Sequence, residues 1–547
     1  MKQTENMLRL TRAGLRDAAG WNKIGVKTPS FDLEQMEENT RQAPVWLHFG
    51  AGNIFRAFIA NIQHQLLEQG LEKSGIVAAD TFDFEMIDRV YSQHDSLSLL
   101  VHLRPDGKAD RKVVAGVAYG LRADTADKEQ FEQLKKVICA PSLQMVSYTI
   151  TEKGYALRDL QGKMLAPVEQ DMQQGPENCR HAMSVTAALL WERFRTSGAP
   201  VAMVSMDNCS HNGEKLKSSV TEIARAWQEA GFVSEEFIRW LSDESCVSFP
   251  WTMIDKITPR PDKGIAQALE QEGVEGMEPF VTSRGSYTAA FVNAEVPQYL
   301  VVEDRFPNGR PALEKAGVYM ADRDTVNNTE RMKVTTCLNP LHTALAVFGC
   351  LLGYTSIAAE MQDADLKQLV ERIGWQEGMP VVTDPGIIRP ADFLTEVLTQ
   401  RLPNAFIPDM PQRIATDTSL KLPIRYGETL KAYAADEKLD VASLTGIPLV
   451  IAGWCRYLLG VDDQLQKMEV SSDPMLPHLQ AELEGVEPGY PQSAQGKLRA
   501  ILHNEVLFGV DLYEIGLADR VETMFGEMLA GAGAVRSTLQ KYLNEEK

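Results

Sequence analysis

The sequence of 547 residues has few cysteines, no basic run and no long apolar stretch, and each absence excludes a class of protein. Its seven cysteines are scattered and odd in number, without a C-x-x-C pair. This pattern indicates reduced thiols in a cytoplasm rather than a disulfide framework or a zinc site. No Lys/Arg-rich run offsets the net charge of −20, so nucleic-acid phosphates would be repelled.

Membrane and secreted proteins are also excluded by what is missing. The longest apolar stretches, at 344–352 and 447–454, fall short of the roughly 18 to 20 residues that span a bilayer. The N-terminal sequence lacks the uninterrupted apolar core of a signal peptide. We therefore expect a cytoplasmic protein, a monomer or small homo-oligomer, with no membrane or nucleic-acid partner.

What is present is the composition of a globular protein, with 44% hydrophobic and 24% charged residues, long enough for two or three domains. Residues 1–40 are polar with few periodic apolar positions, which predicts a surface arm. In 41–322, short apolar runs alternate with helical patterns, which predicts an α/β domain with a Rossmann-like, mostly parallel sheet. Helical patterns dominate 323–547 and predict a mainly α-helical C-terminal domain. The strand candidates are 45–49, 75–79, 112–117, 144–150 and 200–205.

A glycine-rich turn, FGAGNIFRA at 49–57, follows the first strand candidate. Gly50 and Gly52 would let the backbone approach a pyrophosphate held at the N-terminus of the next helix. The usual third glycine is replaced by Phe55, so an ordinary strand-to-helix turn is an open alternative. If the turn binds a dinucleotide, the candidate residues are Gly50, Gly52, Asn53, Phe55 and Arg56.

Asp80 closes the second strand candidate, about 30 residues after Gly50. A carboxylate there can accept hydrogen bonds from the ribose hydroxyls of a dinucleotide and would repel a 2′-phosphate, which favours NAD over NADP. The alternative is an ordinary exposed loop acid.

Polar clusters stand where buried strands should end. Ligands of open α/β sheets bind beyond the carboxyl ends of strands, so such clusters are site candidates. Each alone could also be a capping or turn network. The clusters are TITEKGY at 149–155, SMDN at 205–208 with Asn212 and Gly213, FPWTMIDKI at 249–257 and EDRF at 303–306.

Together with ERMK at 330–333 and NPLH at 339–342, these segments resemble, in order, the polyol-specific long-chain dehydrogenases of the mannitol dehydrogenase family. The resemblance runs from about Val45 to Tyr457. Within the family it is greatest to the fructuronate reductase (D-mannonate oxidoreductase) branch, through TITEKGY, VVEDRFPNGRP and IAGWCRYLLGVDDQ.

The resemblance implies metal-independent hydride transfer between NAD and a secondary alcohol or ketone. Lys333 would then be the general acid/base, and the amides of Asn208 and Asn339 would hold the reacting oxygen. His342 and Arg413 would contact substrate, and Glu330 would be a proton-relay carboxylate. Further candidates are Thr151, Glu152 and Lys153 for the cofactor, and Asp255 and Lys421 for the substrate.

These residue types suit that chemistry. A lysine with its ordinary pKa of ~10.4 cannot accept a proton at neutral pH, but burial and a nearby positive nicotinamide ring would lower that pKa. Amide N–H donors would stabilise a developing alkoxide without a metal, and no metal-ligand spacing occurs in the sequence. Arg413, Lys421 and Arg425 offer positive charge for a substrate carboxylate, although surface solvation is the alternative for at least one of them.

The segment after Lys333 departs from the family. Five residues rather than the usual four separate Lys333 from Asn339, and Pro-Leu replaces Gly-Ser. On an α-helix one extra residue rotates later side chains by ~100°. A π-bulge could absorb it. Alternatively, the helix could restart at Pro340 with Asn339 as N-cap, which would tie the Asn339 amide to its own backbone.

These observations predict an NAD-dependent oxidoreductase that reduces a keto-uronate to a hexonate, D-fructuronate to D-mannonate by resemblance. The same chemistry on a polyol such as mannitol, or on tagaturonate and altronate, is the alternative. A non-catalytic NAD-binding sensor is disfavoured, because Lys333, Asn208 and His342 are all present.

Overall fold

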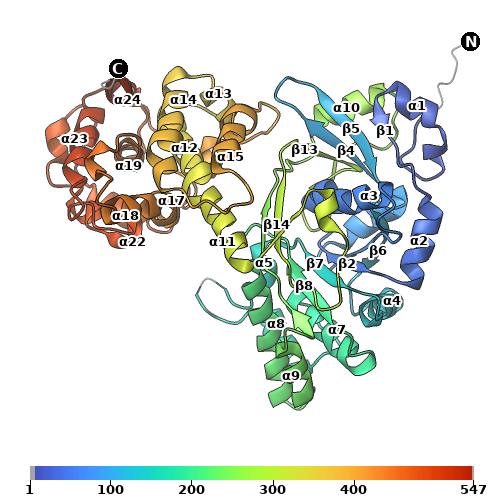
Figure 1. Cartoon of the computed structure of the whole chain (residues 1–547). Coiled ribbons are helices and arrows are strands. Elements are labelled where there is room, and N and C mark those ends of the chain that lie inside the picture. The colour runs from blue at the N-terminus through green and yellow to red at the C-terminus, as the bar shows by residue number, and fades with distance from the viewer. Residues whose placement is uncertain (1–6, 160, 545–547) are drawn as a thin grey trace, which may run out of the picture. The chain divides into compact units, whose positions relative to one another are not determined.

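The computed structural model describes residues 7–159 and 161–544. It consists of two compact units that meet in the sequence between Asn327 and Asn328, and each is described by itself. Figure 1 shows the strands gathered in the first unit and the helices of the second.

The first unit is built on a six-stranded sheet with the order β6-β3-β2-β7-β8-β9. Every neighbouring pair is parallel, and β2 pairs with β3 on one side and β7 on the other. The strand order therefore reverses between β2 and β7, as in dinucleotide-binding folds. The strands are β2 (Trp46–Phe49), β3 (Ile76–Asp80), β6 (Val117–Arg122), β7 (Met145–Tyr148), β8 (Val201–Ser205) and β9 (Val247–Ser248).

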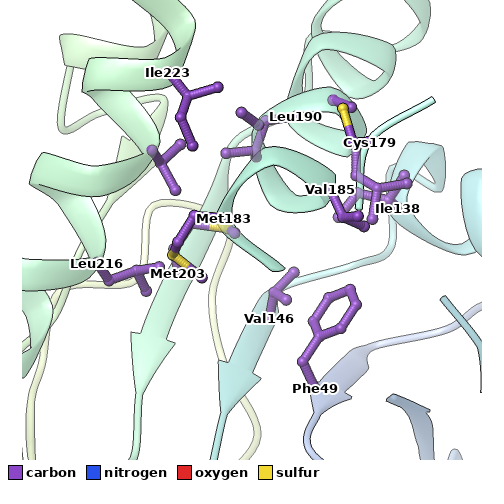
Figure 2. Close-up of a cluster of buried hydrophobic side chains, with 14 of the residues drawn as sticks. Phe49, Ile138, Val146, Cys179, Met183, Val185, Leu190, Met203, Leu216 and Ile223 are labelled. Atoms are coloured by element: carbon purple, nitrogen blue, oxygen red, sulfur yellow. The ribbon is translucent and has the colours of Figure 1, made fainter. Parts of the chain in front are cut away.

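Alternate residues of these strands enter two different cores because side chains alternate across a sheet. Leu47 and Phe49 pack with α4 (Lys128–Cys139), α7 (Ala182–Thr196) and α8 (Asn212–Glu229). Figure 2 shows this core, in which side chains of α7 and α8 pack against side chains of the strands. Trp46 lies in the opposite core with α3 (Ala60–Glu68). Burial on both faces explains why the strands are continuous apolar runs in the sequence.

Residues 7–40 are more than the predicted surface arm. Trp21 is fully buried, and β1 (Val26–Lys27) pairs with β5 (Ala109–Val114). A few buried side chains at irregular spacing fix this segment to the rest of the unit, so its sequence shows no hydrophobic periodicity. Its helices are α1 (Ala18–Lys23) and α2 (Leu33–Gln42), and its sheet has the order β1-β5-β4-β13, with β4 (Ser98–Leu103) and β13 (Phe291–Glu295).

The predicted strand 112–117 is wrong in its bounds, because the chain breaks between β5 and β6 at Gly116. A Cβ at Gly116 would lie 2.0 Å from the Ala60 carbonyl oxygen, so helix α3 packs directly on this turn. Two smaller sheets complete the unit. They are β10 (Thr252–Asp255), β14 (Tyr299–Glu303) and β15 (Tyr319–Ala321), and the hairpin of β11 (Phe280–Val281) and β12 (Tyr287–Thr288).

The described part of the second unit is mainly helical, which confirms the predicted order of a Rossmann-like domain followed by a helical region. Helices α12 (Asn339–Leu351) and α19 (Gly446–Tyr457) are apolar on most faces and buried, as expected of core helices. The helical run Arg323–Leu351 is long and apolar enough to cross a membrane, but 83% of its apolar window is buried in the protein. Other helices are α14 (Ala364–Glu371), α15 (Pro390–Glu396), α16 (Pro411–Ile414), α17 (Thr418–Leu422), α18 (Glu428–Ala435), α23 (Ala518–Met528) and α24 (Ala534–Asn544).

His48 in β2 makes the first unit sensitive to acid. Its ring is fully buried, lies 2.6 Å from Ser147 Oγ and 2.9 Å from Thr149 Oγ1, and stacks on Phe55. Burial lowers the pKa of His48 to about 3, and the pKa of His64 falls to about 4 for the same reason. Below pH ~6.5 the unfolded chain therefore binds protons that the folded chain does not.

We expect the unfolding midpoint of the first unit to fall as the pH drops from 7 to 5. Each such histidine contributes up to ~1.4 kcal/mol per pH unit. His48→Asn should reduce that slope, whereas the exposed His478→Asn should not. Thermal unfolding followed at several pH values measures both, and equal slopes for wild type and His48→Asn would contradict the argument.

Candidate active site

The glycine turn lies where the strand order reverses. Gly50 follows β2 with φ +102°, and a Cβ there would lie 2.1 Å from the Thr149 carbonyl oxygen at the end of β7. Only glycine allows this approach. A Cβ at Gly52 would meet no described atom within 4 Å, so the turn is open on that side. The helical run that begins at Asn53 thus has its N-terminus beside the open side of the turn, the position of a pyrophosphate in this fold.

The side chains of Phe55 and Arg56 pack inside the protein, so the predicted cofactor contacts of these two residues would come from their backbone. Phe55 is buried and stacks on His48 with ring centroids 4.0 Å apart. Arg56 is buried, and its guanidinium donates to the carbonyls of Ala289 at 2.8 Å and Phe291 at 2.9 Å. Only the backbone of these two residues remains near the turn.

Asp80 lies at the end of β3, as predicted, but it is not an exposed loop acid. It is only 8% exposed, and burial raises the pKa of its carboxyl group against the opposing effect of backbone donors. Its Oδ1 accepts from the N–H groups of Phe82 and Asp83, both at 2.8 Å, and its Oδ2 accepts from Ala51 N–H at 3.1 Å. Asp80 therefore joins the end of β3 to the glycine turn.

Asp207, after β8, holds the loop beyond β7. Its carboxylate accepts from the N–H groups of Ile150 and Thr151, both at 2.9 Å, and from the Tyr155 hydroxyl at 2.6 Å. Thr151 takes a left-handed conformation (φ +62°) in this arrangement. Helix α5 (Thr151–Tyr155) thereby carries the exposed side chains of Thr151, Glu152 and Lys153 at the carboxyl end of β7, and Glu152 forms an ion pair with Lys215.

Asn212 fixes the next loop. Its amide bonds both the carbonyl oxygen and the N–H of Thr252 in β10, each at 3.0 Å, and also donates to the Asp207 carbonyl oxygen. Asn208, four residues earlier, stays exposed beyond the end of β8. The two asparagines of the motif therefore differ, with one structural and the other at the surface.

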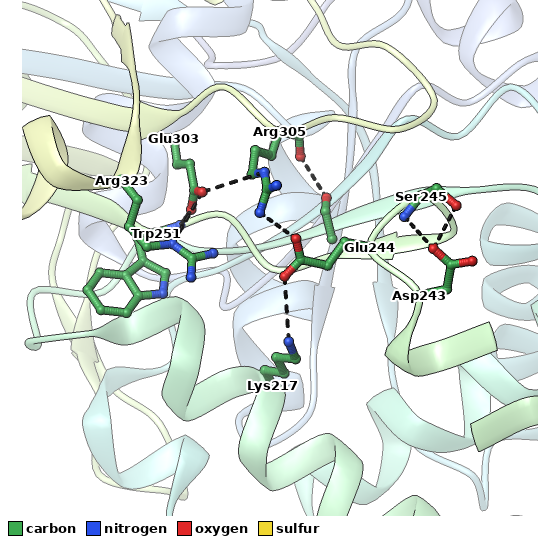
Figure 3. A network of polar contacts seen from close by, with 9 residues as sticks. Lys217, Asp243, Glu244, Ser245, Trp251, Glu303, Arg305 and Arg323 are labelled. Carbon is green, nitrogen blue, oxygen red and sulfur yellow. Dashed lines mark hydrogen bonds and ion pairs between the residues drawn. The ribbon is translucent and has the colours of Figure 1, made fainter. Parts of the chain in front are cut away.

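The clusters at 249–257 and 303–306 form a structural network (Figure 3). Buried Glu303 accepts from Trp251 N–H at 3.0 Å and from Arg323 Nε at 3.1 Å. Arg305 pairs with Glu244, to which Lys217 is also paired at 3.7 Å. Asp255, the predicted substrate contact in this segment, ends β10 and is buried.

In the second unit, Lys333 lies within a π-helical segment, η6 (Met332–Cys337), and is 2% exposed. Leu338 N–H donates to the Lys333 carbonyl oxygen, a five-residue step that takes up the extra residue. The chain then restarts as α12 with Pro340 in its first turn. The predicted π-bulge and the predicted restart of the helix are thus both present. The N-cap is Leu338 rather than Asn339, so capping does not occupy the Asn339 amide. Glu330 lies half-buried, one helical turn before Lys333.

A cluster of charged side chains surrounds His342 in α12, and of these Asp409 is buried. Its Nε2 lies 3.5 Å from Asp409 Oδ2, and the same carboxylate forms an ion pair with Arg413. Burial lowers the pKa of His342 to about 4, with Arg425 acting in the same direction and Asp409 against it. His342 is therefore neutral at physiological pH. The sequence had not indicated Asp409, since its partner lies 67 positions away.

The three predicted cations of this region separate by environment. Lys421 donates to the carbonyl oxygens of Ile414 and Thr416, so it closes its own loop, and burial lowers its pKa to about 8. Arg425 is largely buried and donates to Thr343 Oγ1 at 2.6 Å, next to His342. The Arg413 side chain is 71% exposed. The Lys421 ammonium group is thus bound within its own loop, which argues against the predicted contact with the substrate. Within the described residues, no group of three or more His, Cys, Asp or Glu side chains could hold a metal ion.

Comparisons with known proteins agree with this arrangement. The Mannitol dehydrogenase Rossmann domain matches residues 45–315, and the Mannitol dehydrogenase C-terminal domain matches 325–529. D-mannonate oxidoreductase of Thermotoga maritima is 51% identical over 541 residues, covering 98% of this chain and 100% of that protein. Polyol:NADP oxidoreductase of Gluconobacter oxydans is 29% identical over 84% of this chain and 87% of its own length.

Two solved structures share the fold over nearly the whole chain. A substrate-free D-sorbitol dehydrogenase has a TM-score of 0.77 and 25% identity, covering 94% of this chain and 97% of its own. Pseudomonas fluorescens mannitol 2-dehydrogenase, in a ternary complex with NAD and D-mannitol, has a TM-score of 0.69 and 24% identity, covering 98% and 100%. The resemblance found in the sequence is thus confirmed over both units, and the chain belongs to the mannitol dehydrogenase family of oxidoreductases.

Proposed function

We propose that the protein is an NAD-dependent oxidoreductase that reduces a keto-uronate to a hexonate, D-fructuronate to D-mannonate. The observation that carries this proposal is the 51% identity to D-mannonate oxidoreductase over the whole length of that protein. The arginines around His342 support it, since they suit a substrate with a carboxylate. Reduction of an uncharged ketose to a polyol is the second candidate, favoured by the polyol-specific relatives.

The dinucleotide would lie across the carboxyl ends of β2 and β7. The turn from Gly50 to Asn53 would bind the pyrophosphate, and α5 would border the nicotinamide side through Thr151, Glu152 and Lys153. Asp80 would accept hydrogen bonds from the adenosine ribose through the remaining lone pairs of its carboxylate. When bound, NADH supplies the hydride.

Lys333 would supply the proton that the reduced oxygen needs. Lys333 is 2% exposed, and burial disfavours the charged ammonium, which makes its proton easier to donate. In the reverse direction, burial leaves more of the lysine as the neutral amine, the form that can accept a proton. Glu330, one turn away, would relay protons between Lys333 and solvent. The amides of Asn339 and Asn208 would donate N–H groups to the reacting oxygen, and neutral His342 would hydrogen-bond a neighbouring substrate hydroxyl.

The substrate carboxylate would bind the arginines rather than Lys421. Arg413 is exposed and oriented by Asp409, and Arg425 is held beside His342 through Thr343. Asp255 is kept as a further candidate contact for the sugar acid.

Lys333→Ala should bind NADH normally and lose roughly 10²-fold or more in turnover, because the acid/base is gone. In the oxidation direction, the wild-type kcat/KM should rise with pH through one ionisation that the variant lacks. A small added amine should restore part of the rate. The competing candidate is tested with Lys153→Ala, which removes the exposed lysine of α5. If Lys333→Ala is active and Lys153→Ala is inactive, Lys153 rather than Lys333 is the general acid/base.

Asp80 should make NADH a far better cofactor than NADPH. Asp80→Asn removes the negative charge and keeps an oxygen acceptor for the turn. It should therefore reduce the difference in kcat/KM between NADH and NADPH. Steady-state kinetics with both cofactors measures this. Equal kcat/KM values in the wild type would refute the preference.

Arg413→Ala should raise KM for a keto-uronate strongly, with a loss of about 2 to 4 kcal/mol in binding. Any activity on an uncharged ketose should change little. Arg389→Ala is the matched control, because Arg389 is another exposed arginine of this unit in a local ion pair with Asp392. Equal losses for charged and uncharged substrates would show that Arg413 does not bind the carboxylate.

A further inference from the structure

The hairpin of β11 and β12 is additional to the six-stranded sheet, and its contacts hold it beside the turn that follows Asp80. Thr282 Oγ1 donates to Asp83 Oδ2 at 2.6 Å. Ser283 N–H donates to Glu85 Oε1 at 2.9 Å, and the Arg89 guanidinium lies 3.5 Å from the Phe280 ring centroid. A segment about 200 positions later in the sequence is thus fastened to the end of β3.

These contacts bring Arg284, at the hairpin tip, over Phe82. The guanidinium carbon lies 5.1 Å from the centre of the Phe82 ring. Phe82 is 60% exposed, which is unusual for an aromatic side chain on a well-held turn. The turn is well held because the N–H groups of Phe82 and Asp83 both donate to Asp80. The ring is therefore kept in solvent by the same carboxylate that ends β3.

The position of Phe82 and Arg284 after β3 indicates which part of a dinucleotide could bind there. In this fold the acid at the end of the second strand lies beside the adenosine ribose, so the base must lie farther out, along the residues that follow that strand. Phe82 is the second residue after Asp80. An exposed aromatic face and a planar guanidinium are the two surfaces on which a nucleobase stacks.

We propose that Phe82 and Arg284 form the adenine site of the dinucleotide, with the base stacked on the Phe82 ring and the hairpin tip closing over it through Arg284. The inference rests on the proposed dinucleotide-dependent function and extends it to a hairpin that has no other assigned role. It also gives a role to the contacts of Thr282 and Ser283, which keep the hairpin tip beside Phe82 while the Arg284 side chain moves off the ring to admit the base.

The test uses ADP-ribose, which has the adenosine but no nicotinamide, and reduced nicotinamide mononucleotide, which has the nicotinamide but no adenosine. Phe82→Ala should weaken ADP-ribose binding by roughly 10-fold in calorimetry and raise KM for NADH similarly, with kcat unchanged. Arg284→Ala should act in the same direction. Phe82→Tyr should restore binding, and Phe232→Ala, which removes another exposed phenylalanine of this unit, should behave as wild type.

Activity with reduced nicotinamide mononucleotide separates stacking from misfolding. The kcat/KM measured with reduced nicotinamide mononucleotide should be the same in the wild type and in Phe82→Ala. Unchanged ADP-ribose binding in Phe82→Ala, or an equal loss with the mononucleotide, would overturn the adenine site. A wild-type protein that binds ADP-ribose but reduces no keto-uronate would overturn the proposed substrate while the variant comparison still decides the adenine site. A wild type that binds no ADP-ribose would overturn the site itself.

Discussion

The contact between Gly50 and the Thr149 carbonyl oxygen is the constraint on which the first unit depends. Strands β2 and β7 run side by side in parallel, and the chain leaves them in opposite directions. The turn after β2 must therefore pass directly over the end of β7, and only a residue without a Cβ can do so. This turn also leads into the helical run that begins at Asn53, on its open side. One steric requirement thus shapes both the sheet and its anion-binding end.

Polar side chains then fix the loops at this end of the sheet. Asp80 joins the end of β3 to the glycine turn, Asp207 joins the loop after β7 to β8, and Asn212 joins the loop after β8 to β10. Each side chain has several backbone partners, so removal of one would leave several N–H or C=O groups unpaired. The loops consequently have defined conformations that expose Asn208 and the side chains of α5. Most of the polar side chains in the clusters predicted from the sequence belong to this scaffold.

The sequence predicted the sheet well because buried parallel strands are continuous apolar runs, as in β2, β3 and β8. It missed the N-terminal segment, where Trp21 and a few other anchors lack a period. It could not resolve the π-helical step at Lys333, since one extra residue permits several local solutions. Asp207 and Asp409 went unassigned because partners such as Tyr155 and His342 lie 52 and 67 positions away. The sequence also could not show that Lys421 and Arg413 differ in environment. Lys421 donates to carbonyl oxygens of its own loop, whereas the Arg413 side chain is exposed.

The central proposal is that this member of the mannitol dehydrogenase family prefers a sugar acid to an uncharged sugar. The most direct measurement is the rate of NADH oxidation by the wild-type enzyme with D-fructuronate, D-tagaturonate and D-fructose under identical conditions. The account predicts a kcat/KM for D-fructuronate well above the values for the other two. A higher kcat/KM for D-fructose would contradict it and make the protein a polyol dehydrogenase.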